Sequence, residues 1–88
     1  MTIENISVIQ WLRNTSDRLK GKIDTPLSDS RVLLADQLRK DTAWLAAHPE
    51  YQLDQNTILD LEGKIARLSQ GEPLPYILGW WEFFGFKL

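Results

Sequence analysis

The sequence predicts an all-α fold, a small bundle of four to five helices that ends in an aromatic tail. Apolar residues recur at helical spacing along most of the chain, and glycines or prolines separate the segments in which they do so. Hydrophobic residues make up 43% and charged residues 25% of the 88 positions, which is typical of one small globular domain. Because the chain has no cysteine, the stability of this domain has to come from packing.

The first helix is marked by apolar residues near helical spacing, and Gly21 follows it as a stop. These residues are Ile3, Ile6, Ile9, Trp11, Leu12 and Leu19. The stretch Asp24-Thr25-Pro26 then predicts a turn. We expect Pro26 to take the first position of the second helix, because its missing N–H costs nothing there.

A second and a third helix are predicted to meet at a tight corner. The second passes through the apolar residues Val32, Leu33, Leu34 and Leu38 and closes at Arg39 and Lys40. Asp41 can cap the third helix, TAWLAAH at residues 42–48. That helix cannot continue, because Pro49 disfavours the α conformation of the residue before it, so we expect His48 to have a capping role.

The fourth helix opens at Leu53-Asp54. Asp54 can accept hydrogen bonds from the free amides of the first turn, while Leu53 can pack on Ile58 as a hydrophobic staple. One apolar stripe then follows, formed by Ile58, Leu61, Ile65 and Leu68. Gly71 supplies the left-handed residue that ends such a helix, and Pro73 lies just beyond it.

The last part of the chain changes character at Pro73. Up to Gly79 the residues allow at most a helical turn or two. The remaining stretch, WWEFFGFKL at residues 80–88, is dense in aromatic residues, which favours a strand. A strand needs a partner, and we expect none to be left in the chain. We therefore interpret the chain as a fragment that is cut shortly after its first domain.

Charge and hydropathy disfavour two classes of partner. The net charge is −2, and the densest basic group, Arg13, Arg18, Lys20 and Lys22, is weaker than a nucleic-acid footprint and is better interpreted as a solvated helix end. No apolar run approaches the roughly twenty residues of a membrane span, and the start of the chain, MTIENISVIQW, is no secretory leader. We expect no direct nucleic-acid or membrane partner and a cytoplasmic location.

Catalytic residues are not evident either. The only histidine, His48, has no second ligand at metal spacing, and the five glycines are too scattered for a phosphate loop. Trp11 and Trp44 are expected in the core, while Arg31 and Arg67 could face a partner but are more often solvated. Composition and spacing alone therefore indicate a helical binding module.

Two runs carry a resemblance to a known family: RVLLADQLRKDTAWLAAHPEYQL and LEGKIARLSQGEPLPYILGWWEFFGFKL. Residues from about 28 to 88 resemble the amino-terminal domain of the bacterial and organellar release factor glutamine N5-methyltransferases. The most specific match is GEPLPYILG at residues 71–79, followed by Glu82-Phe83 and Gly85-Phe86, and TAWLAAHPE is a second match. In this family the GEPLPYILG run lies at the seam between two domains.

The resemblance implies a longer parent enzyme. Members of the family join a helical bundle, through a β-hairpin, to a Rossmann-like domain that binds S-adenosylmethionine and methylates the glutamine of the Gly-Gly-Gln motif in peptide chain release factors. By this resemblance, residues 1–79 are the substrate-recognition domain, and residues 80–88 begin the interdomain hairpin with its first strand. The catalytic domain is absent, so we expect this chain to bind no cofactor, to be inactive alone and to help dock the release factor.

The resemblance also implies which residues make contacts outside the bundle, with the catalytic domain or with a partner. They are Tyr76, Trp80, Trp81, Phe83, Phe84 and Phe86. We expect the three phenylalanines to alternate between packing on the bundle and facing the hairpin partner and catalytic domain. The alternative is a freestanding helical protein–protein interaction module whose aromatic tail docks into a partner or a second copy. A small nucleic-acid-binding bundle is a third hypothesis, which the net charge argues against.

Overall fold

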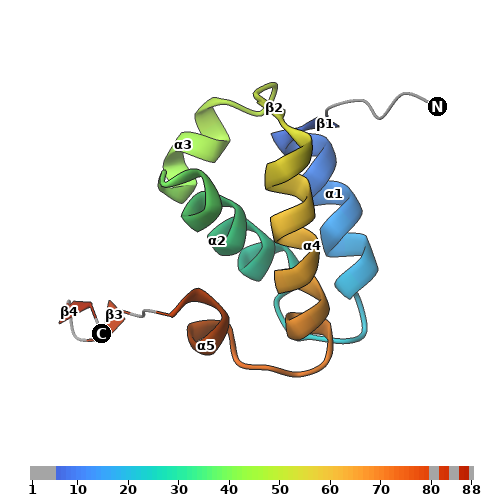
Figure 1. Cartoon of the computed structure of the whole chain (residues 1–88), viewed down its shortest axis with the longest axis vertical. Helices are drawn as coiled ribbons and strands as arrows, with labels where there is room; N and C mark the ends of the chain where they lie inside the picture. The colour runs from blue at the N-terminus through green and yellow to red at the C-terminus, as the bar shows by residue number, and fades with distance from the viewer. Residues whose placement is uncertain (1–5, 80–81, 84–85, 88) are drawn as a thin grey trace.

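The computed structural model describes residues 6–79, 82–83 and 86–87, and side chains as far as Gly79. Five helices are present in this part: α1 (Val8–Leu19), α2 (Pro26–Leu38), α3 (Thr42–Ala47), α4 (Gln55–Ser69) and α5 (Leu74–Leu78). The strands are β1 (Ile6–Ser7), β2 (Gln52–Leu53), β3 (Glu82–Phe83) and β4 (Phe86–Lys87). The predicted all-α bundle of four to five helices is therefore confirmed (Figure 1).

Helix α1 begins later than its apolar pattern predicts. Ser7 is its N-cap: the Ser7 Oγ accepts a hydrogen bond from the Gln10 N–H at 3.2 Å, and the Ser7 N–H donates to Gln10 Oε1 at 3.1 Å. This reciprocal pair satisfies two amides that would otherwise lack partners, and it fixes the start of the helix at Val8. The expectation that Ile6 belongs to the first helix was wrong, and Ile3 lies outside the described residues.

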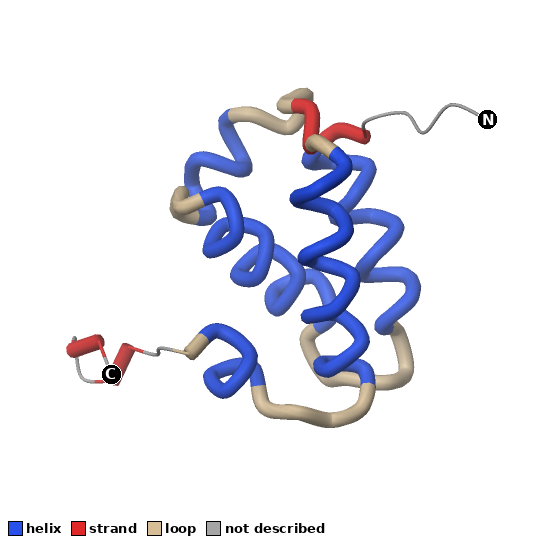
Figure 2. The backbone as a smooth tube through the Cα atoms, viewed as in Figure 1, coloured by secondary structure: helices blue, strands red, loops and turns tan. Residues whose placement is uncertain are grey.

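Ile6 belongs instead to a short antiparallel ladder that joins the segment before α1 to the segment between α3 and α4. Ile6 pairs with Leu53, and Ser7 pairs with Gln52. The first amides of α1 extend this connection, because the Val8 N–H donates to Tyr51 O at 2.9 Å and the Ile9 N–H to Pro49 O at 3.0 Å. Figure 2 shows the ladder at one end of the bundle, where α1 and α4 both begin.

The predicted caps of the other helices are largely confirmed. Pro26 is the first residue of α2, and Asp41 accepts a hydrogen bond from the Trp44 N–H at 2.8 Å at the start of α3. Asp54 accepts from the Thr57 N–H at 2.7 Å and so caps α4. Helix α2 ends at Leu38 with Arg39 as its C-cap, as predicted. The left-handed backbone conformation of Arg39 (φ 59°), which is uncommon for a residue other than glycine, was not predicted.

One hydrophobic core lies between α1, α2 and α4, with α5 closing the end of the bundle farthest from β1 and β2 (Figure 1). Its buried members come from every helix: Val8, Trp11, Leu12, Leu19, Leu33, Leu34, Ala35, Leu45, Leu53, Leu61, Ile65, Leu68, Leu74 and Ile77. Trp11 is buried as predicted, whereas Trp44 only packs against the edge of the core. None of the described helices is long and apolar enough to cross a membrane.

The aromatic tail forms a hairpin with itself. Strands β3 and β4 pair antiparallel, with Glu82 opposite Lys87 and Phe83 opposite Phe86. The expectation that the tail strand has no partner left in the chain was therefore wrong, since the partner begins only three residues further on. Two strands of two residues each bury little surface, so such a hairpin gains little stability from its own contacts.

Candidate functional site

The segment Gly71–Gly79, which carries the most specific part of the resemblance, is anchored to the end of α4. Gly71 has φ 95°, a conformation that a side chain rarely adopts, and its N–H donates to Leu68 O at 3.0 Å. The next amide, on Glu72, donates to Arg67 O at 3.1 Å. These two bonds satisfy carbonyls at the end of α4 and turn the chain back toward the bundle.

A surface ion pair closes the same turn. The Arg67 guanidinium donates to the Glu72 carboxylate across the α4–α5 connection. Hydrogen bonding to Arg67 lowers the pKa of the Glu72 carboxyl below its ordinary value, and the same bond raises the pKa of Arg67. Arg67, which the sequence left open as a partner contact, is thus already engaged within the chain.

Helix α5 is one short amphipathic turn with a buried and an exposed face. Leu74 and Ile77 are buried and contribute to the core, and they hold α5 against α2 and α4. Tyr76 lies on the other face, with 74% of its surface exposed. Its hydroxyl makes no hydrogen bond within the described residues, so this predicted contact residue is available to a partner.

The remaining predicted contact residues follow α5. Gly79 ends the helix at φ 78°, where its N–H donates to Pro75 O at 2.9 Å. The hairpin strands place Phe83 opposite Phe86 in the backbone register. Trp80, Trp81 and Phe84 lie outside the described residues. The backbones of Phe83 and Phe86 therefore pair, while the contact of these residues with a catalytic domain stays a prediction.

An aromatic cluster on α3 was not predicted from the sequence. The Trp44 ring stacks on the His48 ring with a centroid separation of 4.2 Å and meets the edge of Tyr51 at 5.1 Å. The Lys40 ammonium lies 5.5 Å from the Trp44 ring centroid, within cation–π range. The spacing of four between Trp44 and His48 was the available signal, because such residues are neighbours on a helix.

His48 has the capping role that the sequence predicted. It is the C-cap of α3, and its Nδ1 lies 2.9 Å from Trp44 O. Because a carbonyl oxygen only accepts hydrogen bonds, this contact requires the proton to be on Nδ1. The described residues contain no group of three or more His, Cys, Asp or Glu side chains that could hold a metal ion.

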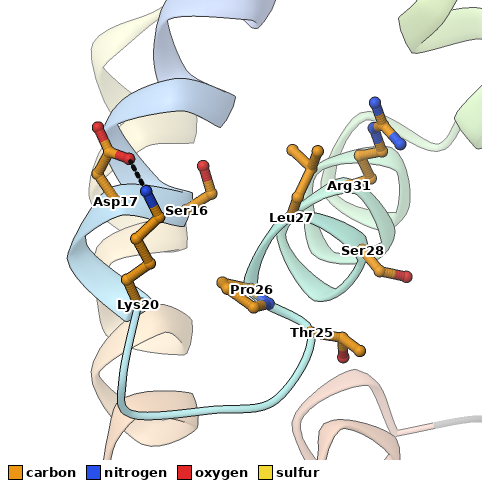
Figure 3. Close-up of a pocket in the computed structure, with 8 residues that line it drawn as sticks. All are labelled: Ser16, Asp17, Lys20, Thr25, Pro26, Leu27, Ser28 and Arg31. Carbon is orange, nitrogen blue, oxygen red and sulfur yellow. Dashed lines mark ion pairs between the residues drawn. The ribbon is translucent and has the colours of Figure 1, made fainter.

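A surface groove between α1 and α2 is the second feature that the sequence did not predict (Figure 3). Its volume is about 490 Å³, and it lies where the last turn of α1, the connecting loop and the first turns of α2 meet. Its lining residues are Ser16, Asp17, Lys20, Thr25, Pro26, Leu27, Ser28 and Arg31. The groove could not be anticipated because it depends on how two helices cross in space.

Comparison with known proteins gives a consistent result. Residues 10–79 match the family model described as the PrmC N-terminal domain. A release factor glutamine methyltransferase from Coxiella burnetii is 36% identical over 83 residues, covering 94% of this chain and 30% of the relative. The Francisella tularensis protein of the same name is 34% identical over 86 residues, covering 98% of this chain and 30% of the relative.

A third relative, the release factor glutamine methyltransferase of Vibrio cholerae, is 40% identical over 65 residues, or 74% of this chain and 23% of the relative. The chain thus spans less than a third of the length of these curated relatives. No solved structure gives a significant match.

Proposed function

The chain belongs to the PrmC N-terminal domain family, and from this membership we propose that it is the release-factor-docking domain of an S-adenosylmethionine-dependent methyltransferase. The parent enzyme would methylate the side-chain amide nitrogen of the glutamine in the Gly-Gly-Gln motif of peptide chain release factors. The support for this proposal is the name shared by the matched relatives, together with the segment Gly71–Gly79, whose short helix α5 packs on the core just before the tail hairpin.

The proposed division of the protein follows the relatives' greater length. Residues 1–79 would form the helical recognition domain, and residues 80–88 would begin the linker hairpin. The methyl donor and the reacting glutamine would bind in a catalytic domain outside this chain, so we expect the chain alone to bind no S-adenosylmethionine and to be inactive. Its partners would be the release factor and that catalytic domain, in the cytoplasm.

The observation that carries the proposal is the way α5 is held. Leu74 and Ile77 are buried in the core, and the Arg67–Glu72 pair closes the turn before α5, so the chain leaves the bundle from a fixed place. Tyr76 points outward at the same place. A rigid exit of this kind can hold a second domain in a defined position relative to a docked protein.

Docking remote from the chemistry has a physical reason. Glutamine side chains are common on proteins, so the reacting amide alone cannot identify the correct substrate. Binding energy from contacts far from the reacting atom can supply both the discrimination and the orientation.

A transfer assay with labelled S-adenosylmethionine and a purified release factor tests the proposal. It compares the protein extended to its natural end, the same protein lacking residues 1–70, and the present chain alone. We expect labelling of the Gly-Gly-Gln glutamine by the first, impaired labelling by the second and none by the third. If the extended protein leaves the release factor unlabelled, the proposal is wrong and the freestanding interaction module replaces it.

A further inference from the structure

The groove between α1 and α2 combines an apolar floor with cations on both walls. Lys20 lies at the end of α1 and Arg31 on α2, and Pro26 and Leu27 lie between them (Figure 3). Leu27 is 41% exposed, although it is a large apolar residue in a folded domain. The walls are fixed because α1 and α2 pack against each other through buried side chains, so the groove is already formed in the free chain.

Arg31 is the cation of the groove for which the described residues supply no partner. Among them it makes no ion pair and no side-chain hydrogen bond, and it is exposed. The two arginines Arg18 and Arg67, by contrast, are paired with Glu62 and Glu72. Arg31 follows Leu27 by four residues on α2, so the guanidinium and the exposed apolar side chain lie on one helix face.

Lys20 is only loosely held. Its ammonium lies 3.6 Å from the Asp17 carboxylate, and about three-quarters of each side chain is exposed. Exposed pairs of this kind contribute little, so Lys20 can exchange Asp17 for a carboxylate from a partner at small cost. The groove therefore offers two cations that a partner can reach beside an apolar surface.

We propose that this groove is the surface on which the release factor docks, and that it takes an acidic segment of that protein. A carboxylate of the segment would pair with Arg31, and an apolar side chain beside it would cover Leu27 and Pro26. Charge complementarity favours an acidic segment, because two cations, Lys20 and Arg31, and only one carboxylate, Asp17, are among the residues that line the groove. Two cations are too few for the basic surface with which proteins hold a nucleic-acid backbone. This inference rests on the proposed function and adds the location of the docking face.

The test uses the protein extended to its natural end and two variants of the groove, Arg31→Glu and Leu27→Ser. The matched control is Arg13→Glu, an exposed arginine of α1 that does not line the groove. For each protein, KM is measured with the intact release factor and with a short peptide that contains the Gly-Gly-Gln motif and no acidic residue. Thermal unfolding by circular dichroism checks that the variants fold.

We expect Arg31→Glu to raise KM for the intact release factor about tenfold, the change that loss of about 1.4 kcal/mol of binding produces. Leu27→Ser should raise it several-fold, while Arg13→Glu should leave it unchanged and no variant should alter turnover of the peptide. If the protein labels the release factor but both groove variants leave KM unchanged, the docking face is elsewhere and the proposed function still stands.

Three other results overturn the groove proposal in distinguishable ways. An equal loss with the short peptide would mean that the groove acts through the fold and not through docking. A gel shift of the chain with single-stranded RNA that Arg31→Glu abolishes would reassign the groove to nucleic acid. No labelling of the release factor by the extended wild-type protein would overturn the proposed function and the docking face together.

Discussion

Gly63 occupies the middle of α4 without a local reason for being glycine. Its backbone is ordinary helix, and a Cβ added there would meet nothing within 4 Å outside its own helix. Alanine in place of a helix-interior glycine stabilises a helix by about 1 kcal/mol, because it restricts the unfolded chain and favours the helix. We therefore expect Gly63→Ala to raise the free energy of unfolding by about that amount in urea titrations.

The control for this prediction is the same substitution two turns later. Gly71 also has open space where a Cβ would project, but its φ of 95° strains any residue that carries one. Gly71→Ala should therefore lower stability while Gly63→Ala raises it. Equal changes in the free energy of unfolding at both positions would show that backbone conformation does not decide whether alanine stabilises or destabilises the chain.

Two carboxylates make the stability of the chain depend on pH in the acid range. The Thr57 N–H lowers the pKa of Asp54 from 3.8, and Arg67 lowers the pKa of Glu72 from 4.5. A group whose pKa is lower in the folded state contributes its stability above the unfolded pKa, and the contribution is lost as pH falls through the folded value. The melting temperature should thus begin to fall near these ordinary values and continue to fall below them.

Neutral variants separate this effect from helix capping. Asp54→Asn keeps a good N-cap side chain but removes the charge, and Glu72→Gln removes the charge that pairs with Arg67. Each should flatten the acid limb of a plot of melting temperature against pH. If the double variant loses melting temperature at low pH as steeply as the wild type, the acid sensitivity belongs to other carboxylates.

At the scale of single elements, the capping box of α1 is the feature whose loss is easiest to measure. Ser7→Ala removes the oxygen that accepts the Gln10 N–H and leaves that amide without its partner. We expect the free energy of unfolding to fall by about 1 kcal/mol in urea titrations. Ser28→Ala is the control, since Ser28 lies exposed in the first turn of α2 and makes no side-chain hydrogen bond to the described residues. A similar loss in both variants would contradict the capping role.

The helices and strands also show which structural features can be predicted from sequence and which cannot. The starts of α2, α3 and α4 were predictable because their signals are local. Asp41 and Asp54 each accept a hydrogen bond from an amide three residues ahead, and Pro26 at the first position of α2 has no N–H that needs a partner. The ladder of β1 and β2 was not, because it pairs residues from opposite halves of the chain and each strand is too short for an alternating pattern. The hairpin of the tail was missed because its two strands are equally short, so the aromatic run is typical of one continuous strand.

The candidate site also contains features that could be predicted from sequence and features that could not. That Gly71 and Gly79 end helices follows from local chemistry and was predicted from the residues. Tyr76 was named as a contact residue through the resemblance, and its exposure keeps that contact a prediction. The partner of Arg67 and the freedom of Arg31 were not predictable, because the first depends on how the turn folds back and the second on the crossing of α1 and α2.

At the scale of the whole molecule, one core has to stabilise all five described helices. Leu34 has no exposed surface, and Leu34→Ala should cost about 2–5 kcal/mol because it removes buried methyl groups and leaves a cavity. That cost is a large part of the stability of so small a domain, so we expect partial unfolding at 25 °C in circular dichroism. Leu59→Ala, at a leucine that is 59% exposed, should change stability by less than about 0.5 kcal/mol. Similar losses at the two positions would contradict the assignment of the core.

The ladder between β1 and β2 has a consequence for the order of events while the chain is synthesised. The Val8 and Ile9 amides donate to Tyr51 and Pro49, so the first turn of α1 lacks these partners until more than half of the chain has left the ribosome. A nascent α1 therefore stays weakly helical until these partners are available, since a short isolated helix is marginal in water. The bundle should acquire its resistance to proteolysis in one late step, after α4 has been synthesised and completes the core with α1 and α2 while Ile6 pairs with Leu53.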